Sequence, residues 1–345
     1  MNNNKLKVVI SGYYGFNNFG DEAVLSVLIN SLKDCGVNDI TVFSKNPEHT
    51  AKTYQVKSSG TFDLCGLFLN IFKSNVLFSG GGSLLQDSTS LKSLVYYLGV
   101  ILVALLLRKK VIIFAQGIGP INNKIFQKIT AFILKQCTYV TVRDEKSYSL
   151  LKNWGLSPNL VSDPVWNLKL KMKYSHRGIG IQLRKWPFVT EDFLQKFAHH
   201  IAENYADKII FIYALQETLD LDVCNRLEEI LKEINPDLHT HVVTNRATFE
   251  IVGAFSHLDE LIAMRYHACL LGLKYGVKVL PIVYDQKVEK LADEFDIKQR
   301  IYFDNDEDFG SKIKNLRYEN YHINNDKLND KYFDFKPFEK IIFSL

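Results

Sequence analysis

The stretch KVVISGYYGFNNFGDEAVLSVLINSL, residues 7–32, decides the fold class. It begins with a short apolar run typical of a buried strand and continues into a glycine-rich turn. The apolar side chains after the turn recur at the spacing of one buried helix face: Val24, Leu25, Val27, Leu28 and Leu32. A strand that leads through a tight turn into a helix is the first unit of a parallel sheet with crossover helices.

The same alternation continues along the chain. Further strands are predicted at 40–43, 76–79, 111–115, 139–142, 178–183, 209–213, 241–243, 261–264 and 277–283. A polar stretch at 167–177 interrupts the pattern and is interpreted as a linker. The sequence therefore predicts an α/β protein of two doubly wound Rossmann-like domains, residues 1–168 and 176–345, facing a cleft in a GT-B-like architecture. The last 40 residues or so carry few signals, and packing of this segment back across the domains stays open.

Composition narrows the protein class. A length of 345 residues suits two hydrophobic cores, and 47% hydrophobic with 23% charged residues argues against wholesale disorder. The net charge of +4 comes from scattered Lys and Arg, which disfavours nucleic acid and fits an anionic small substrate or an anionic membrane surface. Five widely spaced cysteines without a CxxC pair, and no signal-peptide pattern, predict reduced thiols and a cytoplasmic protein.

One segment tests that expectation. Residues 94–107 are continuously apolar and are followed by Arg108, Lys109 and Lys110. The run is too short to span a bilayer, which takes about 20 apolar residues. It is interpreted as a core helix, and the alternative is a helix that lies at the inner face of the membrane.

Ligands of open parallel sheets bind beyond the carboxyl ends of the strands. In the first half, the distinctive residues at such ends are predicted to bind substrate: Gly15, Asp21, Glu22, Gly80, Gly81, Gly82, Asp87, Gln116 and Arg143. The turn around Gly15 is neither GxGxxG nor a P-loop, and Asp21 is equally plausible as a helix N-cap. Three consecutive glycines favour close approach of a ligand over a plain tight turn.

In the second half, Arg184 and Arg265 follow predicted strands, and we expect them to bind substrate together with Arg143. Guanidinium forks match phosphate and carboxylate, although a surface salt bridge is the alternative for each one. His267 is the candidate general acid or base, against a merely structural histidine. Lys287 follows the next strand, where a solvated loop lysine is equally plausible. The remaining histidines show no metal-ligand spacing, so no metal is predicted.

Seven segments, in chain order from residue 10 to 288, carry a resemblance: ISGYYGFNNFGDEAVL, FSGGGSLLQDSTS, IIFAQGIGPI, VTVRDEKSYSLLKNWG, SDPVW, GIQLRKW and MRYHACLLGLKYGVKVLPIVYDQKV. Together they resemble the polysaccharide pyruvyl transferases, in particular the CsaB-type enzymes of cell-wall polymers that anchor S-layers. Two positions depart from the family pattern. Tyr266 stands where Leu is usual, and Lys185 where Pro often precedes Trp186.

The resemblance implies a reaction. Phosphoenolpyruvate would be the donor, with no further cofactor, and its pyruvate would be placed as a ketal on a sugar with release of phosphate. His267 and Lys287 would be the proton-transfer pair, catalytic in this sense, and the arginines would hold the phosphate and carboxylate. The implied acceptor is an N-acetylmannosamine-type sugar on a lipid or nucleotide carrier. Two other functions stay open: a GT-B glycosyltransferase that uses a nucleotide sugar, and a non-catalytic phosphate- or nucleotide-binding protein.

Overall fold

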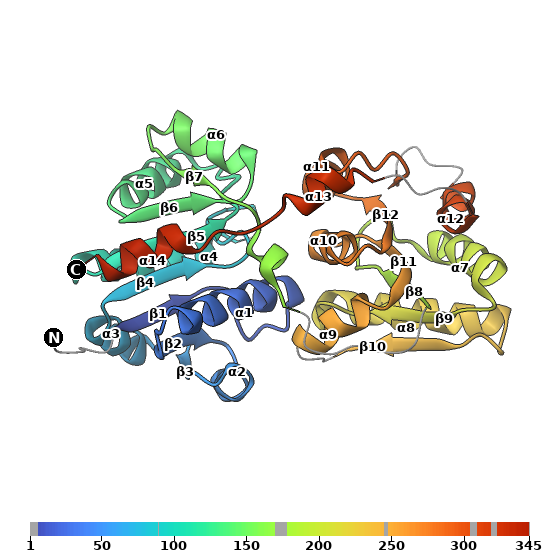
Figure 1. Ribbon diagram of the computed structural model, residues 1–345, viewed down its shortest axis with the longest axis horizontal. Coiled ribbons are helices and arrows are strands. Elements are labelled where there is room, and N and C mark those ends of the chain that lie inside the picture. Colours follow the sequence, from blue (N-terminus) through green and yellow to red (C-terminus); the bar gives the residue numbers. More distant parts are fainter. Residues whose placement is uncertain are drawn as a thin grey trace. The chain divides into compact units, whose positions relative to one another are not determined.

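The computed structural model describes residues 6–88, 90–169, 178–244, 248–303, 309–318 and 323–344. The chain divides into two compact units, one of residues 1–168 with 332–345 and one of residues 169–331 (Figure 1). Each unit contains a parallel sheet whose strands alternate with helices along the chain. The prediction of an α/β protein with two doubly wound Rossmann-like domains is confirmed. Residues 170–177 of the predicted linker lie outside the described residues.

The first sheet has seven strands in the order β3-β2-β1-β4-β5-β6-β7. Their bounds are β1 (Lys7–Ser11), β2 (Asp39–Ser44), β3 (Lys57–Gly60), β4 (Val76–Gly80), β5 (Lys110–Gln116), β6 (Tyr139–Val142) and β7 (Asn159–Leu160). The helices are α1 (Phe19–Asp34), α2 (Pro47–Tyr54), α3 (Leu64–Lys73), α4 (Leu91–Leu106), α5 (Lys124–Lys135), α6 (Glu145–Asn153) and the 3₁₀ turn η1 (Pro164–Asn167). The strand order reverses between β1 and β4, and ligands of open α/β sheets bind at such a switch point.

Helix α4 contains most of the apolar run 94–107 and lies largely in the core. Its buried side chains pack with those of α3 and α5 over the strands of the first sheet: Leu94, Tyr97, Leu98, Val100, Ile101 and Ala104. The prediction of a core helix agrees with this packing. Within the described ranges, no helix is long and apolar enough to cross a membrane. Some apolar side chains of α4 nevertheless face outward, among them Leu106.

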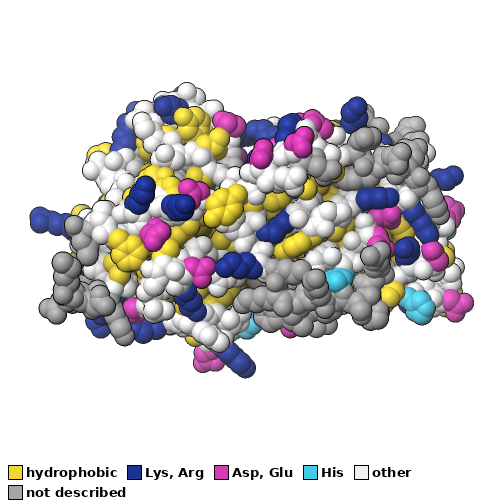
Figure 2. Space-filling view, viewed as in Figure 1, with side chains coloured by type: hydrophobic (Ala, Val, Ile, Leu, Met, Phe, Trp, Pro, Cys, Tyr) yellow, Lys and Arg dark blue, Asp and Glu magenta, His cyan; other side chains and the backbone are white. Residues whose placement is uncertain are grey.

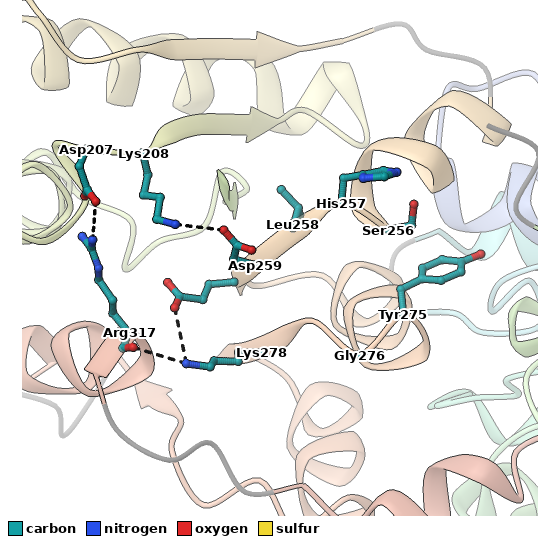
Figure 3. A pocket seen from close by; sticks show the side chains of 11 residues that line it. Asp207, Lys208, Ser256, His257, Leu258, Asp259, Tyr275, Gly276, Lys278 and Arg317 are labelled. Atoms are coloured by element: carbon teal, nitrogen blue, oxygen red, sulfur yellow. Dashed lines mark hydrogen bonds and ion pairs between the residues drawn. The ribbon is translucent and has the colours of Figure 1, made fainter. Parts of the chain in front are cut away.

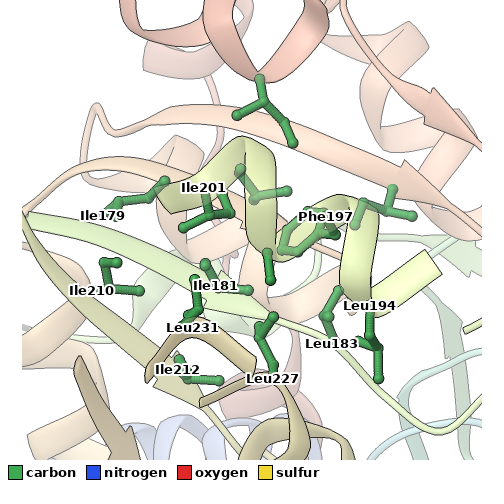
Figure 4. Close-up of a cluster of buried hydrophobic side chains, with 14 of the residues drawn as sticks. Ile179, Ile181, Leu183, Leu194, Phe197, Ile201, Ile210, Ile212, Leu227 and Leu231 are labelled. Atoms are coloured by element: carbon green, nitrogen blue, oxygen red, sulfur yellow. The ribbon is translucent and has the colours of Figure 1, made fainter. Parts of the chain in front are cut away.

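The second sheet has six strands in the order β10-β9-β8-β11-β12-β13. They are β8 (Gly178–Gln182), β9 (Ile209–Tyr213), β10 (Thr240–Val243), β11 (Leu258–Ala263), β12 (Lys278–Val283) and β13 (Ile301–Tyr302). The helices are α7 (Glu191–Tyr205), α8 (Glu217–Ile234), α9 (Thr248–Phe255), α10 (Tyr266–Lys274), α11 (Gln286–Glu294), α12 (Phe309–Tyr318) and α13 (Asn325–Asn329). Figure 4 shows part of the core, where Ile181 of β8 lies among side chains of α7 and α8, including Phe197 and Leu227.

The end of the chain belongs to the first unit. Helix α14 (Lys336–Phe343) places the Phe338 ring 5.1 Å from that of Phe114 in β5 and 5.2 Å from that of Tyr139 in β6. Asn167 donates a hydrogen bond to the carbonyl of Phe333 at 2.6 Å and accepts one from its N–H at 2.9 Å. Residues 332–345 therefore group with residues 1–168. The sequence analysis counted them with the second domain but left open that the end of the chain packs back across the domains. Their aromatic side chains bury apolar surface on the first sheet.

Candidate active site

The predicted residues of the first unit lie at the carboxyl ends of strands β1, β4, β5 and β6 or in the segments that follow them, with Gly80 and Gln116 as the last residues of β4 and β5. These four strands are consecutive in the sheet and parallel, so their carboxyl ends lie along one edge. The structure therefore brings the candidates of the first half to a common edge, as the sequence pattern predicts.

The loop after β1 is shaped by the carboxylate of Glu22. The N–H of Gly15, where φ is +76°, donates to Glu22 Oε1 at 2.7 Å, and the hydroxyl of Tyr54 donates to Oε2 at 2.7 Å. Burial raises the pKa of Glu22, against the lowering effect of these two hydrogen bonds. The side chain of Asn18 accepts from the N–H of Gly20 and is the N-cap of α1. Asp21 is therefore a buried residue of the first helical turn and not the N-cap.

The three glycines at the end of β4 and directly after it pack against the loop after β1. The hydroxyl of Tyr14, which is fully buried, donates to the carbonyl of Gly80 at 2.8 Å. Gly81 and Gly82 have φ of +93° and +48°, and a Cβ on Gly82 would lie 2.3 Å from Asp21 Oδ1. Contacts within the chain already require glycine here. Ligand contact at these glycines stays a prediction.

Asp87 joins two loops of the same edge. Its carboxylate accepts the N–H of Asn122 at 2.8 Å and that of Asn123 at 2.9 Å, just before α5. These hydrogen bonds lower the pKa of Asp87. The carboxylate thus fixes the loop that follows β5, which gives Asp87 a structural role beside its predicted one.

Gln116 and Arg143 are held by buried partners. Nε2 of Gln116 donates to Ser79 Oγ at 3.0 Å, and among the described residues its buried Oε1 has no hydrogen-bond partner. Arg143 forms an ion pair with Asp163 at 2.8 Å, and the two side chains are only 7% and 1% exposed. Arg143 thus forms a salt bridge that is buried, and not the surface salt bridge that the sequence analysis gave as the alternative. Substrate binding by Arg143 stays a prediction.

The candidates of the second unit follow β8, β11 and β12, which are also consecutive in their sheet. Arg184 comes after β8, Arg265 and His267 come after β11, and Lys287 comes after β12. Parallel pairing places these three strand ends along one edge of the second sheet. Two guanidinium groups, an imidazole and an ammonium group thus lie in the segments that directly follow adjacent strands.

Arg265 is fixed through both its side chain and its backbone. Its Nε and Nη2 donate to the two carboxylate oxygens of Asp220 in α8, at 2.7 and 2.5 Å. Its N–H donates to Oε1 of Gln182 in β8 at 2.8 Å. Asp220 is fully buried, so this bidentate pair is shielded from water. The residue that precedes α10 is therefore rigidly placed.

Arg184 has a different environment. Its guanidinium lies 5.4 Å from the ring centre of Trp186 and 5.2 Å from that of Tyr284, and Nη1 donates to the Tyr284 hydroxyl at 3.1 Å. Among the described residues no carboxylate pairs with Arg184, and its buried Nε has no hydrogen-bond partner. A partly buried guanidinium without a counter-charge favours an anionic ligand.

His267 and Lys287 belong to the first turns of neighbouring helices. His267 is the second residue of α10, half-buried, with its ring 5.1 Å from that of Tyr266 at 79°. Lys287 is exposed in the first turn of α11, where its N–H donates to the N-cap carboxylate of Asp285 at 2.7 Å. Helix N-termini favour anions, so the backbone of both helices adds to the positive character of this edge.

A cavity of about 920 Å³ lies at the opposite, amino-terminal edge of the second sheet (Figure 3). Its wall includes Leu258 and Lys278, the first residues of β11 and β12. The charges that line it are paired: Lys208 with Asp259 at 3.2 Å, Arg317 with Asp207 at 2.7 Å and Lys278 with Glu260 at 3.7 Å. The charged side chains of this cavity neutralise one another, and none of the predicted site residues lines it. We therefore place the candidate site of the second unit at the carboxyl edge of its sheet.

The comparisons with known proteins agree with the sequence resemblance. Residues 18–286 match the model of a family described as polysaccharide pyruvyl transferase. The chain belongs to this family. The matched region runs from the N-cap of α1 to the first residue of α11, so it contains every predicted site residue of the transferase except Gly15 and Lys287. A search of curated proteins gave no match.

Solved structures similar to this pyruvyl transferase confirm its GT-B-like fold. HepE from Anabaena, in complex with UDP and glucose, is 9% identical with a TM-score of 0.57, over 91% of this chain and 90% of that one. UDP-GlcNAc 2-epimerase from Methanocaldococcus jannaschii is 12% identical with a TM-score of 0.60, over 90% and 91%. UDP-N-acetylglucosamine 2-epimerase from Rickettsia bellii is 11% identical with a TM-score of 0.61, over 99% and 96%. Sequence identities this low show only that the fold is similar.

Proposed function

We propose that the protein transfers pyruvate from phosphoenolpyruvate to a sugar of a cell-wall or surface polysaccharide, forming a ketal and releasing phosphate. The observation that carries this proposal is the cationic edge of the second sheet, where Arg184 has no carboxylate partner among the described residues. Phosphoenolpyruvate has a phosphate and a carboxylate, both of which guanidinium groups bind well. Membership of the pyruvyl transferase family supports the reaction type.

The chemistry assigns a role to each residue. Protonation of C3 makes C2 of the enol phosphate electrophilic, and two sugar hydroxyl oxygens then bond to C2 as its bond to the phosphate oxygen breaks. One of the two hydroxyl protons reprotonates the acid that gave its proton to C3, and the other leaves on the released phosphate. His267 supplies the proton to C3, and Lys287 with the arginines stabilises the charge of the departing phosphate. This scheme needs no metal and no further cofactor.

We infer that the acceptor is an N-acetylmannosamine-type sugar on a lipid or nucleotide carrier, as in the CsaB-type enzymes, and that the reaction takes place in the cytoplasm. The structures of similar fold support a sugar-nucleotide or sugar-diphosphate acceptor only through the architecture that they share. HepE, for example, is a structure with UDP and glucose.

The test measures phosphate release from phosphoenolpyruvate with a panel of N-acetylmannosamine-containing acceptors. We expect release that depends on both substrates, and its loss by at least about 100-fold in His267→Ala, the contribution typical of a general acid. His199→Ala, which removes an exposed imidazole of α7, serves as the matched control and should retain activity. Near-normal turnover by a folded His267→Ala protein would remove this residue from the mechanism.

A parallel assay separates the proposal from its alternatives. The same protein is incubated with UDP-sugars and the acceptor panel, without phosphoenolpyruvate. Glycosyl transfer in this assay, with no phosphate release in the other, would make the protein a nucleotide-sugar glycosyltransferase. Binding of phosphoenolpyruvate or of a UDP-sugar, with turnover of neither, would favour a non-catalytic binding protein.

A further inference from the structure

Helices α3, α4 and α5 each carry a stripe of large apolar side chains that faces outward. Within each helix the members lie three, four or seven residues apart, which aligns them along one side. We call these residues the α3–α5 surface: Leu64, Phe68 and Phe72; Leu91, Val95, Leu102 and Leu106; Ile125, Ile129 and Phe132. Phe72, Leu106 and Phe132 are 57%, 74% and 66% exposed, so these side chains contribute little to the core.

The three stripes lie side by side. Helix α4 contacts α3 on one side and α5 on the other, and the opposite sides of all three helices fill the same core over the first sheet. Ile71 of α3, Ile101 of α4 and Ile133 of α5 are examples of that inward set. Each helix is therefore apolar on two sides, one that packs into the core and one that no element of the described part of the chain covers. Contiguous exposed apolar surface of this kind marks an interaction site.

The charges on the same three helices are of one sign. They contain five lysines and no Asp or Glu: Lys73, Lys92, Lys124, Lys128 and Lys135. None of these lysines pairs with a carboxylate in the described part of the chain. Arg108, Lys109 and Lys110 come directly after Leu107, the C-cap of α4. By contrast, the face of the molecule in Figure 2 carries Asp and Glu interspersed with Lys and Arg. With five lysines and no acidic residue, helices α3, α4 and α5 together carry a charge of +5, which exceeds the net charge of +4 of the whole chain.

We propose that the α3–α5 surface docks on the surface of a lipid bilayer with anionic head groups. The apolar stripes would enter the boundary of the acyl chains, and the lysines would reach phosphate-bearing head groups with their long stems. Each lysine near an anionic bilayer contributes to binding, and the contribution is screened by salt. A second copy of the chain fits less well, because a symmetric pair would bring lysines against lysines. The proposal rests on this surface and is independent of the transfer reaction.

The experiment measures flotation of the full chain with vesicles. Vesicles of phosphatidylcholine alone are compared with vesicles of equal parts phosphatidylcholine and phosphatidylglycerol, at low and high salt. We expect binding to the anionic vesicles that decreases as salt is added. The combined variant Phe72→Ser, Leu106→Ser, Phe132→Ser and the combined variant Lys92→Glu, Lys124→Glu, Lys128→Glu should each bind at least about tenfold more weakly.

The matched control is Tyr332→Ser, which removes an aromatic ring of similar exposure, 65%, that lies outside the α3–α5 surface. It should float like the unmodified protein, and urea unfolding should show that all variants keep their fold. Absence of the unmodified protein from the anionic vesicles at low salt would overturn the proposal. So would flotation of either combined variant that equals that of the unmodified protein, or a dimer in light scattering that the serine variant converts to a monomer without any vesicle binding.

Discussion

The guanidinium of Arg265 donates two hydrogen bonds to the buried carboxylate of Asp220, at 2.7 and 2.5 Å. Gln182 links the same pair to β8, because its Oε1 accepts from the N–H of Arg265 and its Nε2 donates to Asp220 at 3.3 Å. The start of α10 is thus fixed from a strand and from a helix. His267, two residues after Arg265, owes its position to this network.

We predict that Asp220→Ala destabilises the second unit by about 3–5 kcal/mol, because it leaves a guanidinium that is only 13% exposed without its counter-charge. Urea unfolding measures the loss. The double variant Asp220→Ala, Arg265→Ala should lose less than the sum of the two single variants, since neither charge is then left alone. A loss below about 1 kcal/mol in Asp220→Ala would mean that the pair behaves like a surface ion pair.

We predict that Gly82→Ala costs more stability than Gly36→Ala. Both glycines have positive φ, +48° and +86°, so both substitutions strain the backbone by about 1–2 kcal/mol. Gly36 has open space for a Cβ, whereas a Cβ on Gly82 would lie 2.3 Å from Asp21 Oδ1. The difference in the free energy of unfolding isolates this clash. Equal losses would show that Asp21 moves away freely.

We predict that Asp87 stabilises the folded protein in a way that depends on pH. Its pKa is lowered in the folded protein, so the carboxylate adds stability above its unfolded pKa of about 3.9 and loses that contribution as the pH falls through the folded pKa. The melting temperature of Asp87→Asn should therefore lie below that of the unmodified protein by a constant amount above about pH 5, and the gap should narrow below about pH 4. A gap that does not change with pH would contradict the assignment.

We predict that Phe338→Ala destabilises the first unit by about 3–5 kcal/mol, because the ring is fully buried against Phe114 and Tyr139. Phe343→Ala removes a ring of the same helix that is 45% exposed and should cost much less. Limited proteolysis should release the segment 332–345 more readily from the Phe338 variant. Similar resistance in both variants would show that α14 is held by its other contacts.

The apolar strands could be predicted because buried parallel strands are short runs of Val, Ile, Leu and Phe, whereas their order within each sheet was not predicted. The three missed strands lack this signal. β3 reads KSSG and pairs at the sheet edge with β2, while β7 and β13 have two residues each. The pairing of these strands depends on neighbours that are distant in sequence, so local pattern could not reveal it.

For the candidate site, the sequence predicted the positions of the site residues but not the residues that hold them in place. Positions after strands could be recognised, and they do follow neighbouring strands of each sheet. Their partners could not, because the partners come from elsewhere in the chain. Asp220 lies within α8, and nothing in that helix sequence distinguishes it from a solvated acid. Asp163 and Tyr284 lie inside the segments SDPVW and LPIVYDQKV, where the resemblance could have drawn attention to them.

The return of residues 332–345 to the first unit makes that unit discontinuous in sequence, with residues 169–331 inserted into it. During synthesis on the ribosome, the inserted unit is complete before the first one is. Until Phe333 and Phe338 have been made, the apolar side chain of Phe114 lacks its aromatic neighbours from that segment. The first unit therefore cannot complete its fold until the inserted unit has been synthesised. During that interval, the apolar surface of the first sheet that residues 332–345 later cover is exposed and is a binding site for chaperones.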